Sequence, residues 1–396
     1  MIQRLLQDAL LQVAGQYPVV CLLGPRQSGK STLTRMAFPD KPYVTCKDAS
    51  TFMLAQDPVA FFRQVPTGAV IDEIQRVPSL VEHLMTVVDA QAAPGRWILT
   101  GSENLGVRRT VAESLAGRVA LLHLLPFSHA ELSASERRPR TLAEAILHGG
   151  YPPLYDPTRT LEPWRWHANY LDTYVQNDVL SMLRIHDRTA FWRFLQLCAR
   201  HVGCLTNAQQ WGAEIGKDSK TIAGWLAVLE ANFVLRLLPT SGVTLGKRMV
   251  KHPKLYFYDT GLVCRLLGLT EVHQVTGHPQ WGNLVENWCM MEVQKARWHR
   301  GLDDGLSHWR SSDGHEVDLL LQAGGQLHPI EIKAHQTADP SLAGGLHWWR
   351  AAAVAKAQQA IGTPMVIYSG ERTVDLAQVR LVPWHGIDSA LAGLGP

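Results

Sequence analysis

"LLGPRQSGKS", from Leu22 to Ser31, decides the fold of the N-terminal part of this 396-residue chain. It fits the pattern Gly-x-x-x-x-Gly-Lys-Ser, follows the apolar run "YPVVCLL" and precedes "STLTRMAF", which has the character of a helix start. A strand, a glycine-rich loop and a helix in this order form the context that a phosphate-binding loop requires. The glycines let successive backbone N–H groups converge on a phosphate at the helix N-terminus. The motif therefore predicts a nucleotide site on an α/β sheet.

The loop residues have separate expected roles. Lys30 is expected to reach the outer phosphates of ATP, and the Ser31 hydroxyl is expected to ligate Mg²⁺. The predicted nucleotide-binding residues of the loop are Gly24, Gly29, Lys30, Ser31 and Thr32. The alternative is a glycine-rich turn that arose by chance.

An acidic pair follows in "TGAVIDEIQRVP", where a short apolar strand ends in Asp72 and Glu73. In a nucleotide site one such carboxylate helps to hold Mg²⁺, and the other orients and deprotonates the attacking water. We assign the first role to Asp72 and the second, catalytic role to Glu73. The alternative is a strand-end turn with two solvated acids.

Two further segments carry candidate residues of the same site. The strand "RWILTGSEN" ends in the polar residues Thr100, Ser102 and Asn104. Polar groups at the carboxyl ends of parallel strands face the ligand crevice, so Thr100 or Ser102 is expected to sense the terminal phosphate. Arg118, in "ESLAGRVALLHLL", is expected to stabilise transition-state charge across a subunit boundary. The alternative for Arg118 is an ordinary salt bridge.

Composition limits the class of protein. Hydrophobic residues make up 46% and charged residues 18%, which is typical of a globular chain, and the length predicts two or three domains. The net charge of +3 permits a nucleic-acid partner without requiring one. Six scattered cysteines favour free thiols, and no apolar run approaches the roughly 18 residues that span a bilayer. A cytoplasmic protein with no membrane partner is expected. Serine and cysteine hydrolases are set aside because no nucleophile motif occurs in a suitable context.

The middle of the chain has the pattern of a winged helix. "LTNAQQWGAEIGKDSKTIAGWLAVLEANFVLRLLPT" predicts a helix, a tight turn at Gly216, a second helix capped by Asp218 or Ser219, and a strand. The second helix of such a unit normally enters the major groove of DNA. The candidate contact residues near its N-terminal end are Ser219, Lys220, Thr221 and Ala223. The alternative is a winged helix that serves as a protein contact.

A basic segment, "GKRMVKHPK", stands between the two expected wing strands. Its basic residues are Lys247, Arg248, Lys251, His252 and Lys254. Such a cluster is expected to neutralise DNA phosphates and to make binding salt-dependent. The alternative is a charged hairpin that is only solvated.

The last third carries a second acidic pattern. "NLVENWCMMEVQKARW" predicts a helix with Glu286, and the strands "EVDLLLQ" and "LHPIEIKA" are joined by a glycine turn. Because side chains alternate along a strand, Glu331 and Lys333 project from one face, and Asp318 meets them if the two strands pair.

An Asp followed by Glu-x-Lys on the next strand resembles the PD-(D/E)xK nuclease core, with Val317 where that pattern has proline. The resemblance implies that Asp318 and Glu331 hold Mg²⁺, or alternatively Mn²⁺, and that Glu286 completes the metal shell. It implies a catalytic role for Lys333, which would orient or activate water near the scissile phosphate. The alternative is an ordinary amphipathic strand.

The motifs "GPRQSGKS", "IDEIQ", "LTGSEN", "ESLAGRV" and "LPFSHAEL" together resemble the nucleotide-binding domain of a prokaryotic AAA-type ATPase family. The resemblance continues in "YLDTYVQNDV" and "KHPKLYFYDTGL", so it covers most of the chain. It implies ATP binding and hydrolysis, with a DNA-binding module and a nuclease-like fold behind the ATPase. The physiological role of that family is largely unsettled.

The expected fold class is α/β: a P-loop NTPase parallel sheet at 1–135, a helical and winged-helix middle domain at 136–275, and a restriction-endonuclease-like α/β domain at 276–396. The expected function is ATP hydrolysis coupled to an action on DNA by a homo-oligomer, with metal-dependent DNA cleavage as a second activity. Two alternatives stay open. One is an ATP-dependent switch whose last domain cuts nothing, and the other is a protein-remodelling ATPase.

Overall fold

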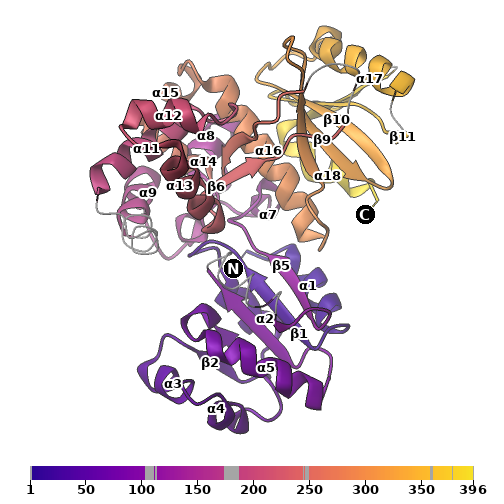
Figure 1. Cartoon of the computed structure of the whole chain (residues 1–396). Helices are drawn as coiled ribbons and strands as arrows, with labels where there is room; N and C mark the ends of the chain where they lie inside the picture. Colours follow the sequence, from indigo (N-terminus) through magenta and orange to yellow (C-terminus); the bar gives the residue numbers. More distant parts are fainter. Residues whose placement is uncertain are drawn as a thin grey trace. The chain divides into compact units, whose positions relative to one another are not determined.

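The computed structural model (Figure 1) describes residues 2–102, 111, 114–173, 187–243, 245, 249–356, 360–376 and 378–395. Asn104, part of "YLDTYVQNDV", Lys247 and Arg248 lie outside the described residues. The chain divides into two compact units. Unit 1 comprises Met1–Phe127, Ala231–Val234 and Trp298–Gly301, and unit 2 comprises Ser128–Glu230, Leu235–Arg297 and Leu302–Pro396.

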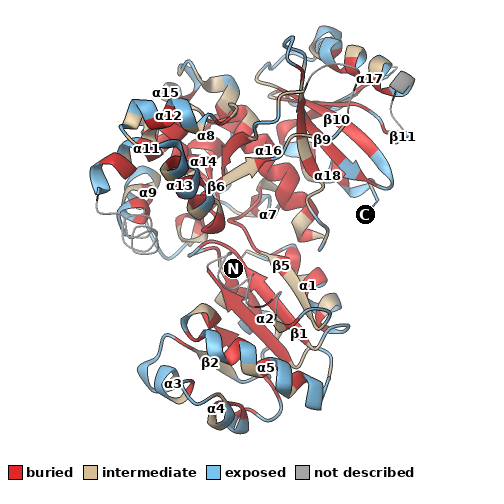
Figure 2. Cartoon of the chain, viewed as in Figure 1, coloured by how far each residue is buried: buried red, intermediate tan, exposed pale blue. Residues whose placement is uncertain are grey.

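Unit 1 is built on a parallel sheet with the strand order β2-β3-β4-β1-β5. The strands are β1 (Val19–Leu23), β2 (Tyr43–Thr45), β3 (Ala69–Asp72), β4 (Trp97–Gly101) and β5 (Val119–His123). All residues of β1, β3 and β4 are buried, as Figure 2 shows in red. Continuous apolar runs of this kind are typical of parallel strands covered on both faces. The parallel α/β sheet expected around the phosphate-binding loop is confirmed.

The helices of unit 1 alternate with its strands. They are α1 (Leu6–Ala14), α2 (Lys30–Ala37), α3 (Ala49–Leu54), α4 (Pro58–Gln64), η1 (Ile74–Arg76) and α5 (Pro78–Ala90). Leu6 and Leu10 of α1 and Leu33 of α2 pack with Val20 and Ile98 in one hydrophobic core. This packing fixes α2, and with it the end of the loop, against the sheet.

The first part of unit 2 is mainly helical. Its elements are α7 (His129–Leu132), α8 (Leu142–His148), η2 (Pro152–Tyr155), α9 (Pro163–Tyr170), α11 (Arg188–Arg200), α12 (Ala208–Ile215), α13 (Ser219–Ala231), β6 (Leu235–Leu238), β7 (Lys254–Phe257), α14 (Thr260–Leu267) and α15 (Val272–Thr276). Gly216 ends α12 with φ 75°, and the Asp218 carboxylate accepts the Thr221 N–H at 2.8 Å in the first turn of α13. β6 and β7 pair antiparallel. The expected order of two helices and two strands is present, and its assignment as a winged helix stays a prediction.

The rest of unit 2 surrounds a mixed sheet with the order β13-β14-β12-β10-β9-β8, and β11 also pairs with β10. Its elements are α16 (Trp281–His299), β8 (Leu306–Arg310), β9 (Glu316–Ala323), β10 (Gln326–Lys333), η4 (Pro340–Ala343), α17 (Gly344–Lys356), β11 (Ala360–Ile361), β12 (Met365–Tyr368), β13 (Val374–Asp375), β14 (Arg380–Pro383), η5 (Trp384–Gly386) and α18 (Ile387–Ala392). β8, β9 and β10 run antiparallel, whereas β12 runs parallel to β10. Trp309 and Trp349 fill the core beside Leu320 and Val366. The strands are those expected from the sequence, and the nuclease-like assignment of this sheet stays a prediction.

None of the helices in the described parts of the chain combines the length and the apolar character needed to cross a membrane.

Candidate functional site

The glycine-rich loop leaves the end of β1 and enters α2, as its sequence predicts. A Cβ atom on Gly24 would overlap the carbonyl oxygen of Leu124, so only glycine fits that position. Gly29 precedes the first residue of α2 with φ 94°, in the left-handed region that glycine adopts without strain. The loop therefore ends at a helix N-terminus, where backbone N–H groups favour an anion.

Lys30 is buried beneath this loop. Its Nζ donates hydrogen bonds to the carbonyl oxygens of Gly24 and Pro25, each at 2.8 Å, and the side chain is 6% exposed. Burial lowers the pKa of Lys30 to about 8, although the carboxylates of Glu73 and Asp72 act in the opposite direction. The ammonium is thus held where an incoming phosphate group would strengthen its positive charge.

ATP affinity is expected to fall as the pH rises above about 8. Lys30 loses its proton near that pH in the nucleotide-free protein, and bound phosphate must raise the pKa of Lys30 again. Each unit of raised pKa couples proton uptake to ATP binding, so affinity should weaken by up to about tenfold per pH unit. Calorimetric titration with ATP from pH 7 to 9.5, in two buffers of different ionisation enthalpy, measures this proton uptake.

Lys30→Arg is the control for this titration, because a guanidinium stays charged throughout the range. If the variant still binds ATP, its affinity should not share the alkaline loss. A wild-type affinity that is constant up to pH 9 would contradict the assigned role of Lys30.

Asp72 joins the loop to the end of β3. The Ser31 hydroxyl donates to Asp72 Oδ1 at 3.0 Å, although the two residues are 41 positions apart. Thr45 donates to Asp72 Oδ2 at 3.4 Å, and Thr100 donates to Asp72 as well. Hydroxyl and carboxylate oxygens are ligands that Mg²⁺ prefers. Ser31 and Asp72 therefore fit a Mg²⁺ ion that accompanies the nucleotide, as expected from the sequence.

Glu73 lies next to Asp72 but in a different backbone conformation. Its φ and ψ of 58° and 46° are left-handed, which is unusual for a residue other than glycine and is found most often at functional sites. Its carboxylate pairs with Lys47 Nζ at 2.9 Å and accepts from the Ser102 hydroxyl at 3.1 Å and from Gln75. Burial raises the pKa of Glu73, but Lys47 and Lys30 outweigh burial and hold it below its usual value. Glu73 is therefore ionised at neutral pH, as a general base must be.

The structure brings most of the predicted nucleotide-site residues together. Those at the meeting point of the loop, β3 and β4 are Gly24, Gly29, Lys30, Ser31, Asp72, Glu73, Thr100 and Ser102. Thr100 and Ser102 hold the two carboxylates in place, and their sensing of a phosphate stays a prediction. Thr32 is exposed in the first turn of α2. Sequence analysis missed Lys47 and Gln75, because no local motif marks a side chain that reaches Glu73 only in the folded unit.

Arg118 is placed apart from these carboxylates. Its Nε pairs with the Asp89 carboxylate of the same unit at 2.5 Å, and the side chain is 39% exposed. This ion pair is the arrangement that the alternative interpretation anticipated. A role of Arg118 across a subunit boundary stays a prediction.

The second candidate site lies in unit 2 on the paired strands β9 and β10. Leu319 faces Ile330 in the antiparallel register, which sets the neighbouring Asp318 beside Glu331. Asp318 Oδ2 accepts the Ile332 N–H at 2.9 Å, and Lys333 Nζ contacts Glu331 Oε1 at 2.6 Å. The expectation that the hairpin would bring Asp318, Glu331 and Lys333 together is confirmed.

A lysine from another strand lies among these acids. Lys254, the first residue of β7, is 2% exposed, and its Nζ contacts Glu286 Oε1 at 2.8 Å, Asp318 Oδ1 at 3.3 Å and Glu316. The sequence interpretation that placed Lys254 with the DNA-facing basic residues is wrong, because the side chain turns inward. We call the four carboxylates around it the acidic cluster: Glu286, Glu316, Asp318 and Glu331.

The acidic cluster holds more negative charge than its lysines neutralise. Burial, together with Asp318, raises the pKa of Glu286 to about 7 and that of Glu331 to about 8. Glu331 is 9% exposed, and its Oε2 has no hydrogen-bond partner within the described residues. In the described ranges no three His, Cys, Asp or Glu side chains are grouped as a metal centre. The predicted metal-ligand roles of Glu286, Asp318 and Glu331 stay predictions.

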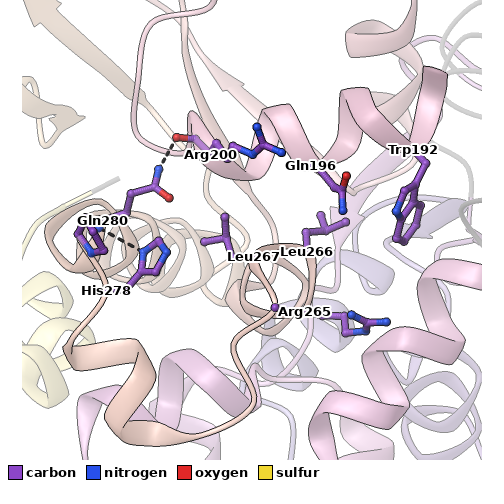
Figure 3. Close-up of a pocket in the computed structure, with 10 residues that line it drawn as sticks. Trp192, Gln196, Arg200, Arg265, Leu266, Leu267, His278 and Gln280 are labelled. Carbon is purple, nitrogen blue, oxygen red and sulfur yellow. Dashed lines mark hydrogen bonds between the residues drawn. The ribbon is translucent and has the colours of Figure 1, made fainter. Parts of the chain in front are cut away.

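A separate pocket of about 930 Å³ lies between α11 and the end of α14 (Figure 3). Trp192, Gln196 and Arg200 line it from one face of α11, since they are spaced four residues apart. Arg265 and Leu267 line the opposite side. The ten described lining residues include two arginines and no carboxylate, so the pocket is cationic. Sequence analysis identified none of these residues.

Comparisons with known protein families divide the chain into three segments. A family model described as "AAA domain" matches residues 16–133, and two models for domains of unknown function, DUF8612 and DUF4143, match residues 139–273 and 281–387. Each model covers less than half of the chain. Together with the geometry of the loop and the acidic pair, the first match identifies the N-terminal segment as a P-loop ATPase domain of the AAA type.

Similar whole proteins have no stated function. The chain is 29% identical over 330 residues to the uncharacterized proteins Mb2031c of Mycobacterium bovis and Rv2008c of Mycobacterium tuberculosis, covering 82% of this chain and 72% of each relative. Among solved structures, it resembles the Walker-type ATPase PABY2304 of Pyrococcus abyssi with a TM-score of 0.43 and 15% identity. That match covers 66% of this chain and 94% of the other, and at this TM-score no conclusion rests on it.

Proposed function

We propose that this chain is an ATPase that couples ATP hydrolysis to an action on DNA. The observation that carries the ATPase part is the assembly of Lys30, the Ser31–Asp72 pair and the ionised Glu73 around one helix N-terminus. These groups supply phosphate binding, a Mg²⁺ position and a base for the attacking water, which are the recurring parts of phosphoryl transfer.

The surface of unit 2 supports DNA as the partner. Lys220 is exposed at the N-terminal end of α13, and Lys251 and His252 are exposed in the segment that leads into β7. Basic side chains on a second helix and a neighbouring hairpin fit the way in which helix-turn-helix units contact phosphates. The proposal includes assembly of several copies of the chain, with Arg118 as the candidate for a contact across the subunit boundary.

The test is ATP turnover by the full chain with and without duplex, single-stranded and branched DNA over a series of salt concentrations. We expect stimulation by at least one form of DNA, and this stimulation should weaken as salt rises, because phosphate contacts release counterions. A Lys220→Ala/Lys251→Ala variant should lose much of the stimulation and keep the basal turnover. Arg140→Ala, at another exposed basic position of unit 2, is the matched control. Turnover that ignores every DNA form would favour a protein-remodelling ATPase.

DNA cleavage is the second candidate activity, and the convergence of Asp318, Glu331 and Lys333 on two paired strands favours it. DNA breakage can be scored in the same reactions with Mg²⁺ or Mn²⁺. Breakage that disappears in Lys333→Ala would support a metal-dependent nuclease. Absence of breakage under both metals, or breakage that persists in the variant, would favour an ATP-dependent switch whose last segment cuts nothing.

A further inference from the structure

The ammonium group of Lys254 has the surroundings of a bound cation. An ammonium has three N–H donors, and three different carboxylates surround this one: Glu286 on α16, and Glu316 and Asp318 on β9. Tyr256, on the same face of β7, donates its hydroxyl to Glu286 Oε1 at 2.6 Å. The strand β7 thus delivers one positive charge to the point where α16 and β9 converge.

A buried lysine needs compensation, because removing its charge from water costs several kcal/mol. Burial indeed lowers the pKa of Lys254, but Tyr256 and the carboxylates outweigh burial and keep it well above the ordinary value. The lysine is therefore charged. Its neighbours are hard oxygen donors of the kind that bind Mg²⁺ or Mn²⁺.

A second observation indicates that one positive charge does not complete this arrangement. Glu331 is nine-tenths buried, feels the charges of Asp318 and Glu316, and leaves Oε2 without a hydrogen-bond partner among the described residues. Its other oxygen is bound by Lys333. An unsatisfied buried oxygen beside three carboxylates that share one ammonium indicates spare capacity for a cation of higher charge.

We propose that Lys254 is the resident cation of the acidic cluster, and that a divalent cation binds there only when the Lys254 ammonium has left. The inference rests on the proposed function, since these acids belong to the candidate nuclease site. Unit 2 with Lys254 in place therefore binds no divalent cation at the cluster. Lys254 directly follows the exposed segment 251–253, so a DNA contact to that segment would act on the strand that carries the ammonium.

The experiment measures Mn²⁺ binding to the nucleotide-free full chain by calorimetry and by the loss of the free Mn²⁺ paramagnetic resonance signal. Lys254→Met removes the ammonium but keeps an unbranched side chain, and should create one Mn²⁺ site at least about tenfold tighter than any site in the wild type. Adding Asp318→Asn to this variant should abolish the new site. Lys254→Arg, which keeps the charge, should not create one.

Lys295→Met is the matched control, because Lys295 is also a buried lysine and contacts the Glu292 carboxylate at 2.8 Å outside the cluster. It should gain no Mn²⁺ site. A folded Lys254→Met protein that gains no Mn²⁺ site would overturn the proposal. If that variant does not fold, wild type and Asp318→Asn decide: equal Mn²⁺ binding supports the proposal, and a wild-type site lost in Asp318→Asn overturns it. The measurement uses neither ATP nor DNA, so its outcome is independent of whether the chain cleaves DNA.

Discussion

Glu73→Gln is expected to lower ATP turnover by about 100-fold or more, because positioned acid–base groups typically contribute a factor of about 10² to 10⁴. The amide has nearly the shape of the carboxylate and can still accept the Ser102 hydroxyl bond, but it cannot take a proton from water. Lys30 and the Ser31–Asp72 pair are untouched by the change. ATP affinity should therefore stay within a few-fold of the wild type, so the loss should appear in kcat.

The measurement is steady-state ATP turnover together with equilibrium binding of ATP and thermal unfolding of each variant. Glu82→Gln, the same change at an exposed position on α5, is the matched control and should leave turnover unchanged. Near-normal turnover in a folded Glu73→Gln protein, with turnover lost in Asp72→Asn, would assign the base role elsewhere and contradict the role given to Glu73.

The nucleotide site was predictable because each of its parts is marked by a local sequence signal. The loop glycines and Lys30 form a contiguous motif, and the acids follow a short apolar strand that β3 confirms. Parallel strands bring their carboxyl ends to the same edge, so residues distant in sequence meet without any further information. The β9–β10 hairpin was predictable for a similar reason, since the Gly324-Gly325 turn and the alternation of side chains fix its register.

Lys254 shows why other parts could not be predicted. In the sequence it stands in a basic run with Lys251 and His252, which are exposed, so composition indicates a solvated segment. Its burial depends on the inward face of β7 and on partners 32 to 64 positions away. Lys47 reaches Glu73 in the same way across the folded unit. Contacts made by single long side chains leave no periodic signal, and only the tertiary structure reveals them.

Asp259 is a further example, and its contacts predict a large effect on stability. Its buried carboxylate accepts the N–H groups of Gly150 at 2.7 Å and Gly261 at 2.9 Å, and lies 3.4 Å from His167 Nε2. A Cβ atom on Gly149 would overlap this carboxylate, so the chain passes it too closely for any side chain. The motif "YDTGL" attracted attention only through a family resemblance, and sequence analysis gave Asp259 no role.

Asp259→Ala is expected to lower the free energy of unfolding of unit 2 by about 3–5 kcal/mol, because it leaves buried N–H groups and His167 without their common partner. Asp259→Asn keeps an acceptor oxygen and should cost less. Asp303→Ala, at an exposed position of unit 2, is the matched control and should change stability little. Urea unfolding followed by tryptophan fluorescence measures the differences.

The pH dependence of stability separates the charge of Asp259 from its shape. Burial raises the pKa of Asp259, but His167 and the Gly150 N–H outweigh burial and hold it below the ordinary value. A lowered folded-state pKa means that this stabilisation is fully present above the unfolded-state value of about 3.9 and is lost as the pH falls through the folded-state value. Asp259→Asn should therefore flatten the loss of stability at acid pH relative to the wild type. Parallel acid profiles for the two proteins would mean that shape and hydrogen bonding, and not charge, account for the contribution of Asp259.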